Sequence, residues 1–293
     1  MKCTLCPRNC GVDRKEKTGF CSAPDCIIVA RASKHMWEEP PISGKSGSGT
    51  IFFSHCNLKC VYCQNYKISA EGFGKDITVE DLSRIMLSLQ NDGAANINLV
   101  SPTPYTHLIS EAVRSCKDEL KIPIIWNTGG YEKAQTIRDL NGIVDVFLTD
   151  MKYISSDLAS EYSNAKDYPI HAVSALHAML ETVGKEEYSP DGMIRKGVIV
   201  RHLVLPSHRD ESIKVLELLK NKFGTEDYSL SLMRQYYPCY MAEKYPKINR
   251  TVTSYEFQKV SEYAEKLGFH GFYQEKGSEK ESYTPAFDLS GIV

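Results

Sequence analysis

The chain alternates between predicted strands and predicted helices along most of its length, and this alternation limits the folds that it can adopt. Short apolar runs predict buried strands at residues 50–54, 96–100, 122–126, 144–148, 197–205 and 228–232. Helices are predicted at residues 79–90, 106–116, 132–139, 171–182, 211–223 and 254–267. Strand–helix units in series imply parallel strands with right-handed crossovers. We therefore predict an α/β fold, and the order of elements alone leaves a doubly wound sheet and an open barrel both possible.

Three cysteines follow the first predicted strand directly. They are Cys56, Cys60 and Cys63, in a CxxxCxxC spacing. In parallel α/β folds, the loops at the C-terminal ends of the strands carry the chemistry. Three thiolates do not complete a tetrahedral zinc site, which normally takes four protein ligands. They can instead bind three irons of a [4Fe–4S] cluster and leave the fourth iron open to a substrate or cofactor.

A second group of cysteines lies near the N-terminus. Cys3, Cys6, Cys10 and Cys21 form a CxxC pair, a third cysteine close behind it and a fourth after a glycine-containing turn. This pattern is typical of metal binding, and so short a polar stretch cannot fold by itself without a cross-link or a metal. The bound metal could be zinc or a second iron–sulfur cluster, because thiolates bind both zinc and iron.

A proline- and glycine-rich stretch at 34–49 reads as a linker between this segment and the rest of the chain. We therefore expect two parts, a separable metal-binding segment at 1–34 and the main domain at 35–293. Within the linker, Gly44-Lys45-Ser46 does not complete a P-loop, because Glu39 stands where the first glycine of that motif would be.

Composition excludes several other classes of function. The chain has 293 residues, 42% of them hydrophobic, which is enough to bury a large core. Its formal net charge of −2 gives no bulk positive field for nucleic acid or membrane binding. It has no run of 18 apolar residues and no recognisable signal peptide, so we expect a cytoplasmic protein. Its ten cysteines are then better explained as metal ligands than as disulfides.

The cysteine loop resembles a known signature. CxxxCxxC with an aromatic residue, Tyr62, before the last cysteine is similar to that of radical S-adenosylmethionine enzymes. The flanking strings 38–44 and 47–65 resemble the uncharacterised branch related to pyruvate formate-lyase-activating enzymes, and the resemblance covers nearly the whole chain. It implies a partial TIM-like barrel of about six βα units. It also implies an oxidoreductase that reductively cleaves S-adenosylmethionine to a 5′-deoxyadenosyl radical.

The resemblance also implies a set of cofactor-binding residues at the strand ends. The family commonly has a Gly-Gly-Glu segment after the second strand, which holds the amino group of S-adenosylmethionine. This chain has Ser101 and Thr103 there, which accept hydrogen bonds without a formal charge. A proline-rich turn that only caps the next helix is the alternative explanation. The full set implied for the cofactor is Tyr62, Ser101, Thr103, Asn127, Asp150, Lys152 and His202.

Two of these assignments depend on strand geometry. Asp150 and Lys152 are two residues apart, so an extended strand would place both side chains on one face, and both can reach the barrel mouth; a surface ion pair is the alternative. Arg201 and His202 are adjacent and must face opposite sides of a strand. By resemblance we assign His202 to the ligand and leave Arg201 either ion-paired or facing the ligand.

The resemblance implies partners as well. An electron donor such as flavodoxin or ferredoxin is expected, together with a substrate that loses hydrogen, such as a glycine of a partner enzyme. The segment 64–78 has no cysteine, which disfavours the activases that carry a ferredoxin-like insertion. Another peptide, a nucleic acid or a small metabolite is the alternative substrate. A non-catalytic iron–sulfur or zinc protein is the alternative from a different class.

Overall fold

The structure is a computed structural model that describes residues 2–278 and 284–292. Its strands are β1 Ile27–His35, β2 Ser48–Phe53, β3 Lys75–Ile77, β4 Ile97–Val100, β5 Ile124–Thr128, β6 Val146–Asp150, β7 Glu187–Tyr188, β8 Ile194–Leu203, β9 Ser229–Met233 and β10 Gly271–Tyr273. Its α-helices are α1 Pro40–Ser43, α2 Tyr66–Ser69, α3 Val79–Asn91, α4 Thr106–Ser115, α5 Ala134–Arg138, α6 Ser156–Ser163, α7 Tyr168–Val183, α8 Arg209–Phe223 and α9 Ser254–Lys266. Two 3₁₀ turns, η1 Thr103–Tyr105 and η2 Ala242–Lys244, complete the elements.

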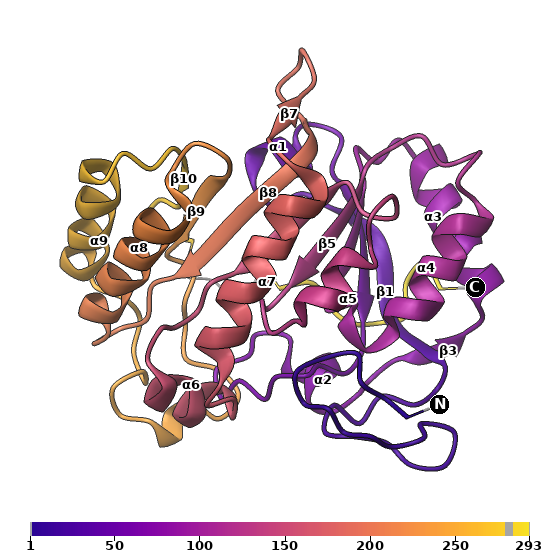
Figure 1. The fold of residues 1–293 in the computed structure, drawn as a ribbon, viewed down its shortest axis with the longest axis horizontal. Coiled ribbons are helices and arrows are strands. Elements are labelled where there is room, and N and C mark those ends of the chain that lie inside the picture. The colour runs from indigo at the N-terminus through magenta and orange to yellow at the C-terminus, as the bar shows by residue number, and fades with distance from the viewer. Residues whose placement is uncertain (1, 279–283, 293) are drawn as a thin grey trace.

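The strands form one curved, open sheet with the longer helices on its outer side (Figure 1). The strand order is β10-β9-β8-β6-β5-β4-β2-β1-β3, and β7 pairs with β8 off this path. All neighbours from β2 to β10 along this order are parallel, whereas β1 runs antiparallel to both β2 and β3. The predicted α/β fold is therefore confirmed as an open, partial barrel with a cysteine-rich N-terminal segment, and the doubly wound alternative is excluded.

Alternate residues of each parallel strand face the barrel interior and the helices. On β8, Ile199 packs in an interior cluster with Ile125 of β5 and Leu148 of β6. Its neighbours Val198 and Val200 belong instead to the larger cluster between the sheet and the helices. The same alternation places Arg201 on the interior side and His202 on the helix side.

The N-terminal end of the barrel is closed by the segment that leads into β2. Ile42 of α1 is fully buried in the interior cluster, and Asn96 Nδ2 donates to its carbonyl oxygen at 2.7 Å. The stretch 34–49, which its composition predicts to be a linker, is therefore packed against the barrel. Its prolines and glycines instead form a short helix with tight turns, and this brings Glu38 and Glu39 to the cavity.

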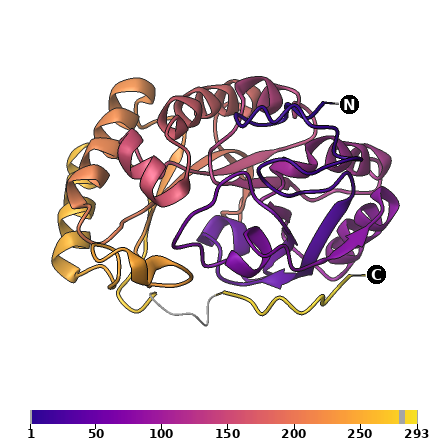
Figure 2. The ribbon, with the colours of Figure 1, turned by 90° about the horizontal axis from the view of Figure 1, so that it is seen from below.

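The C-terminal residues 284–292 run beside β1 (Figure 2). Leu289 N donates to Ala30 O at 3.0 Å, and Ala32 N donates to Ser290 O at 2.9 Å. Phe287 packs edge-on against Phe52 of β2, with 5.5 Å between the ring centroids. The last described residues therefore extend the sheet at its N-terminal strand.

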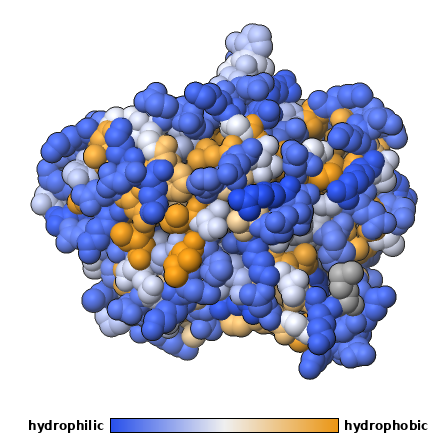
Figure 3. Space-filling model, viewed as in Figure 1, coloured by the Kyte–Doolittle hydropathy of each residue, from blue (hydrophilic) through white to orange (hydrophobic). Residues whose placement is uncertain are grey.

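The outer face is mostly hydrophilic, with apolar side chains visible in patches between the helices (Figure 3). The helix α3 is typical: its buried side is mostly apolar, and Thr78 and Asp81 form a capping box at its start. Among the described residues, no helix is both long and apolar enough to cross a membrane.

Candidate active site

A cavity of about 470 Å³ lies at the C-terminal ends of the parallel strands. The cysteine loop after β2 forms one part of its wall, and the ends of β4, β5, β6, β8 and β9 form another. A volume of this size suits a small-molecule cofactor. The predicted residues that line it are Cys56, Cys60, Cys63, Tyr62, Ser101, Asn127, Asp150 and Lys152.

Each thiol of the cysteine loop has a hydrogen-bonding group of this chain beside it. Leu58 N donates to Cys56 Sγ at 3.5 Å, and Ser163 Oγ lies 3.0 Å from Cys60 Sγ. Ser69 Oγ lies 3.2 Å from Cys63 Sγ. Burial raises the pKa of Cys56 to about 12 and that of Cys63 to about 11. The loop thus holds soft ligand atoms in the cavity, and a bound metal cation would stabilise the ionised form of Cys56 and Cys63.

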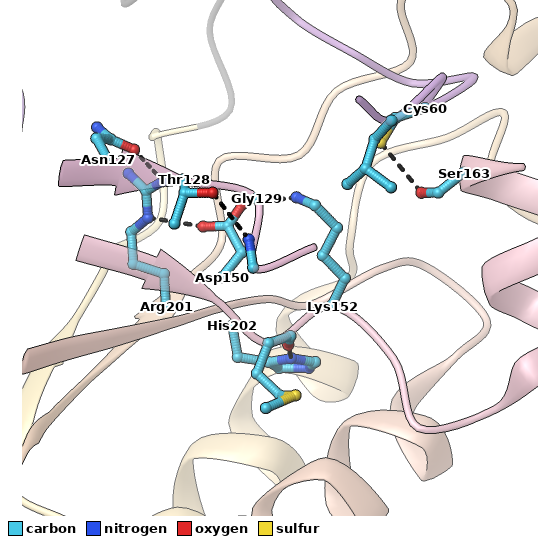
Figure 4. A network of polar contacts seen from close by, with 12 residues as sticks. Cys60, Asn127, Thr128, Gly129, Asp150, Lys152, Ser163, Arg201 and His202 are labelled. Atoms are coloured by element: carbon cyan, nitrogen blue, oxygen red, sulfur yellow. Dashed lines mark hydrogen bonds and ion pairs between the residues drawn. The ribbon is translucent and has the colours of Figure 1, made fainter. Parts of the chain in front are cut away.

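A network of charged side chains lies beside the thiols on the interior side of the strands (Figure 4). Asp150 accepts hydrogen bonds from Arg201 Nε at 2.8 Å and from Lys152 Nζ at 2.6 Å. Arg201 Nη2 also donates to Asn127 Oδ1 at 2.7 Å. Burial alone would raise the pKa of Asp150, but the two cations hold it below its ordinary value. Asp150 is therefore a carboxylate that fixes the positions of both cations.

Asp150 and Lys152 both reach the cavity at the end of one strand. The strand β6 ends at Asp150, and Lys152 follows two residues later in the loop. Gly130, at φ +81°, allows the turn after β5 to approach closely, because a Cβ there would lie 2.2 Å from the Asp150 carbonyl oxygen. Gly130 thus allows the two backbone segments to pack together at the mouth.

Two carboxylates that sequence reasoning did not assign also line the cavity. Glu38 Oε1 accepts from Asn98 Nδ2 at 2.9 Å, and Glu38 Oε2 lies 3.7 Å from Arg201 Nη1. Burial raises the pKa of both Glu38 and Glu39, against the attraction of Arg201. In the sequence these carboxylates are visible only as an acidic pair directly before Pro40-Pro41. This pattern does not indicate which strands the pair contacts.

Two predicted cofactor residues lie elsewhere. His202 is buried on the helix side of β8, where Nδ1 lies 2.7 Å from Met151 O and Nε2 lies 2.8 Å from Ser212 Oγ of α8. The assignment of His202 to the ligand therefore needs correction, because strand alternation turns Arg201 to the cavity in its place. Thr103 is likewise outside the cavity lining, since it is buried in η1 and its hydroxyl donates to Glu132.

Glu132 gives a pH-dependent prediction. Burial raises its pKa from 4.5 to about 7, although Thr103 and Thr128 donate to it. Between these pH values the folded protein keeps a proton that the unfolded chain has released, so stability falls by about 1.4 kcal/mol per pH unit as pH rises. Glu132→Gln should remove this slope, as measured by urea unfolding at several pH values. An unchanged slope in the variant would contradict the assignment.

The four predicted N-terminal ligands line a second, much smaller cavity. Cys3, Cys6, Cys10 and Cys21 all contribute to it, and Cys26 does not. In the described ranges 2–278 and 284–292, no group of three or more Cys, His, Asp or Glu residues is drawn together closely enough for a metal ion. Cys3, Cys6, Cys10 and Cys21 form no disulfide.

The fold and the cysteine loop together define a class: an open barrel of parallel strands with three thiols and a set of polar residues at its C-terminal mouth. The sequence profile of the Radical SAM superfamily matches residues 50–222 of the chain. This protein belongs to that superfamily, whose members use a [4Fe–4S] cluster and S-adenosylmethionine.

Individual proteins are also similar to this chain. The uncharacterized protein MJ0674 of Methanocaldococcus jannaschii is 31% identical over 279 residues, which cover 92% of this chain and 76% of MJ0674. SuiB of Streptococcus suis, solved with its precursor peptide SuiA, has a TM-score of 0.53 at 15% identity over 76% of this chain. A radical SAM methyltransferase from Sphaerobacter thermophilus has a TM-score of 0.53 at 13% identity, covering 79% of this chain and 68% of its own. The match spans only 47% of SuiB, and these identities show a shared fold alone.

Proposed function

We propose that this protein is a radical S-adenosylmethionine oxidoreductase and that Cys56, Cys60 and Cys63 bind its [4Fe–4S] cluster. The observation that carries the proposal is that these three thiols line one cavity together with polar side chains from the neighbouring strand ends. When bound, a three-thiolate cluster and S-adenosylmethionine supply the 5′-deoxyadenosyl radical that abstracts hydrogen from a substrate.

The residues of the barrel would bind and orient the cofactor. Lys152 presents an ammonium group suited to the methionine carboxylate, and Asp150 fixes its position. Asn127 and Ser101 offer uncharged donors and acceptors at the ends of β5 and β4. Tyr62 lies in the wall and is itself held by a hydrogen bond between its hydroxyl and that of Tyr153. Thr103 and His202 are not among the proposed cofactor-binding residues, because both lie outside the cavity lining.

Anaerobic reconstitution with iron and sulfide tests the proposal. The reduced protein should give the EPR signal of a [4Fe–4S] cluster, the signal should change on adding S-adenosylmethionine, and 5′-deoxyadenosine should form under reducing conditions. A non-catalytic iron–sulfur or zinc protein would show neither the spectral change nor the product. Either absence in a protein with full iron content would refute the enzymatic proposal.

For the substrate, we propose a protein or peptide, and a glycine in a partner enzyme is the first to test. The resemblance of residues 38–44 and 47–65 to the branch of the activating enzymes supports this choice. The peptide-bound SuiB is compatible with it, at the level of the fold. Co-incubation with candidate partners and a flavodoxin or ferredoxin should produce a glycyl-radical EPR signal in the partner. If no candidate partner acquires such a radical, the glycine proposal fails, and another peptide, a nucleic acid or a small metabolite is the next substrate to test.

The hydroxyl beside Cys60 gives a further prediction. With Cys60 as a thiolate, Ser163 must be the donor across the 3.0 Å contact, and hydrogen bonds to cluster sulfurs raise the reduction potential. Ser163→Ala should therefore make the potential more negative, by roughly 40 mV for a bond worth about 1 kcal/mol more in the reduced state. An EPR-monitored redox titration measures this.

The matched control for that titration is Ser110→Ala. Ser110 is also buried, but its hydroxyl donates to Thr106 O within α4, away from the cysteine loop. The control should keep the wild-type potential. A shift of equal size in both variants would mean that the effect is a general loosening of the barrel, and not a hydrogen bond to the cluster.

A further inference from the structure

We propose that Cys3, Cys6, Cys10 and Cys21 bind a single zinc ion in a structural site separate from the barrel cavity. All four cysteines line one small cavity of about 10 Å³. Leu5, Arg8, Asn9, Arg14 and Gly19 complete its wall. Four thiolates around one ion are a common ligand set of structural zinc.

The segment around this cavity has little else to hold it together. Between residues 2 and 26, all of which are described, the chain forms no helix and no strand beyond the single bridge Lys2–Asp13. Among these residues, Ala23 alone belongs to the buried hydrophobic core. The conformation is nevertheless specific, since Cys3 N donates to Val12 O at 2.8 Å and Gly11 N donates to Cys3 O at 3.0 Å. A segment without a core is stabilised effectively by a bound metal.

The charges around the cavity match a tetrathiolate zinc site. Four thiolates and one Zn²⁺ carry a net charge of −2, and two guanidinium groups, those of Arg8 and Arg14, line the cavity. Arg14 is 7% exposed and donates to Ala23 O at 3.2 Å. Arg8 Nη2 is buried without a hydrogen-bond partner among the described residues. A buried N–H donor without a partner is stabilised by a neighbouring anionic centre.

The size of the cavity favours one ion over a cluster. A volume of about 10 Å³ holds one water-sized sphere, whereas a [4Fe–4S] cube needs several times that space. The backbone of Gly19 packs closely on Cys10, because a Cβ there would lie 2.8 Å from Cys10 Sγ. The sulfur atoms are not yet at coordination spacing, so zinc binding must draw the thiols inward as it orders the loop.

The segment is docked on the barrel beside the cysteine loop, which differs from the separable segment that the sequence predicts. Arg8 Nε donates to Asn57 O at 2.9 Å, one residue from Cys56. Lys133 Nζ and Thr136 Oγ1, which flank the start of α5, donate to Thr4 O and Leu5 O, each at 2.7 Å. The zinc ion would therefore hold in place a loop that contacts the backbone of the barrel site.

Metal analysis of the full-length protein tests the site. Wild-type protein and the Cys26→Ala variant should each carry about one zinc per chain, because Cys26 lies outside the cavity. Cys10→Ala and the Cys3→Ala/Cys6→Ala pair should lose it. Iron is measured in the same samples, so failure of the barrel cluster is seen separately. Zinc retained in Cys10→Ala, or lost equally in Cys26→Ala, would overturn the proposal.

X-ray absorption at the zinc edge of the wild-type protein provides a test that needs no variant. Four sulfur neighbours at about 2.3 Å would support the tetrathiolate site. Nitrogen or oxygen neighbours, the absence of zinc after growth with added zinc, or acid-labile sulfide and iron that depend on Cys10 would each overturn it.

Discussion

Cys60→Ala is expected to abolish cluster binding in the barrel and, with it, the cleavage of S-adenosylmethionine. Two remaining thiolates cannot hold a [4Fe–4S] cube with one open iron, so about four iron atoms per chain should be lost after reconstitution. The product 5′-deoxyadenosine should fall to the level of the protein-free control. Iron analysis and chromatography of the quenched reaction measure the two effects.

The matched control is Cys116→Ala. Cys116 is a buried cysteine whose Sγ donates to Ala112 O at 3.3 Å, and it lies outside the cavity lining. This variant should lose some stability and keep its iron. If Cys116→Ala lost iron to the same extent, the loss would reflect unfolding. If Cys60→Ala kept its iron and its product, the cysteine loop would not be the cluster site.

The cysteine loop could be predicted because its information is local. The spacing of Cys56, Cys60 and Cys63 and the apolar run before them lie within 14 residues, 50–63. The strand–helix alternation is local in the same way. The apolar runs did mark β5 and β6 two residues too early, because these strands continue into the polar residues that line the site, such as Asn127 and Asp150. Strand ends that carry function break the hydrophobic pattern that marks a strand.

The choice between Arg201 and His202 shows a different limit. Alternation places neighbours on opposite faces, but it does not say which face is the interior. The partners that decide it, Asp150 for Arg201 and Ser212 for His202, are 51 and 10 residues away in the sequence. Charge would have been a better guide than resemblance, because a buried guanidinium needs carboxylates and these lie on the interior side.

The part of the cavity wall that Glu38 and Glu39 form could not be predicted from local patterns. Glu38 and Glu39 stand in a proline-rich stretch that reads as a linker, and β1 before it was not predicted as a strand. Their positions follow from the antiparallel pairing of β1 with β2, a contact between segments whose sequences carry no pairing signal.

Arg201→Met is expected to destabilise the fold by about 3–5 kcal/mol, because it leaves buried carboxylates without their main cation. Arg201 is 15% exposed, and its guanidinium contacts both Asp150 and Glu38. In the variant, Lys152 would be the remaining partner of Asp150. The matched control is Arg138→Met, because Arg138 is 48% exposed and its pair with Glu181 lies on the surface. That change should cost less than about 1 kcal/mol.

The pH dependence of this loss separates its electrostatic cause from a simple packing defect. In the wild type, the stability that comes from the lowered pKa of Asp150 is present at neutral pH and is lost as pH falls through the folded-state pKa. Without Arg201 the same carboxyl should take up a proton at higher pH, as should Glu38, whose pKa burial already raises. The loss of unfolding free energy in Arg201→Met, measured by urea unfolding relative to the wild type, should therefore be clearly smaller at pH 5 than at pH 8. A deficit independent of pH would show that Arg201 acts by filling space, and that the carboxylates of the cavity do not depend on its charge.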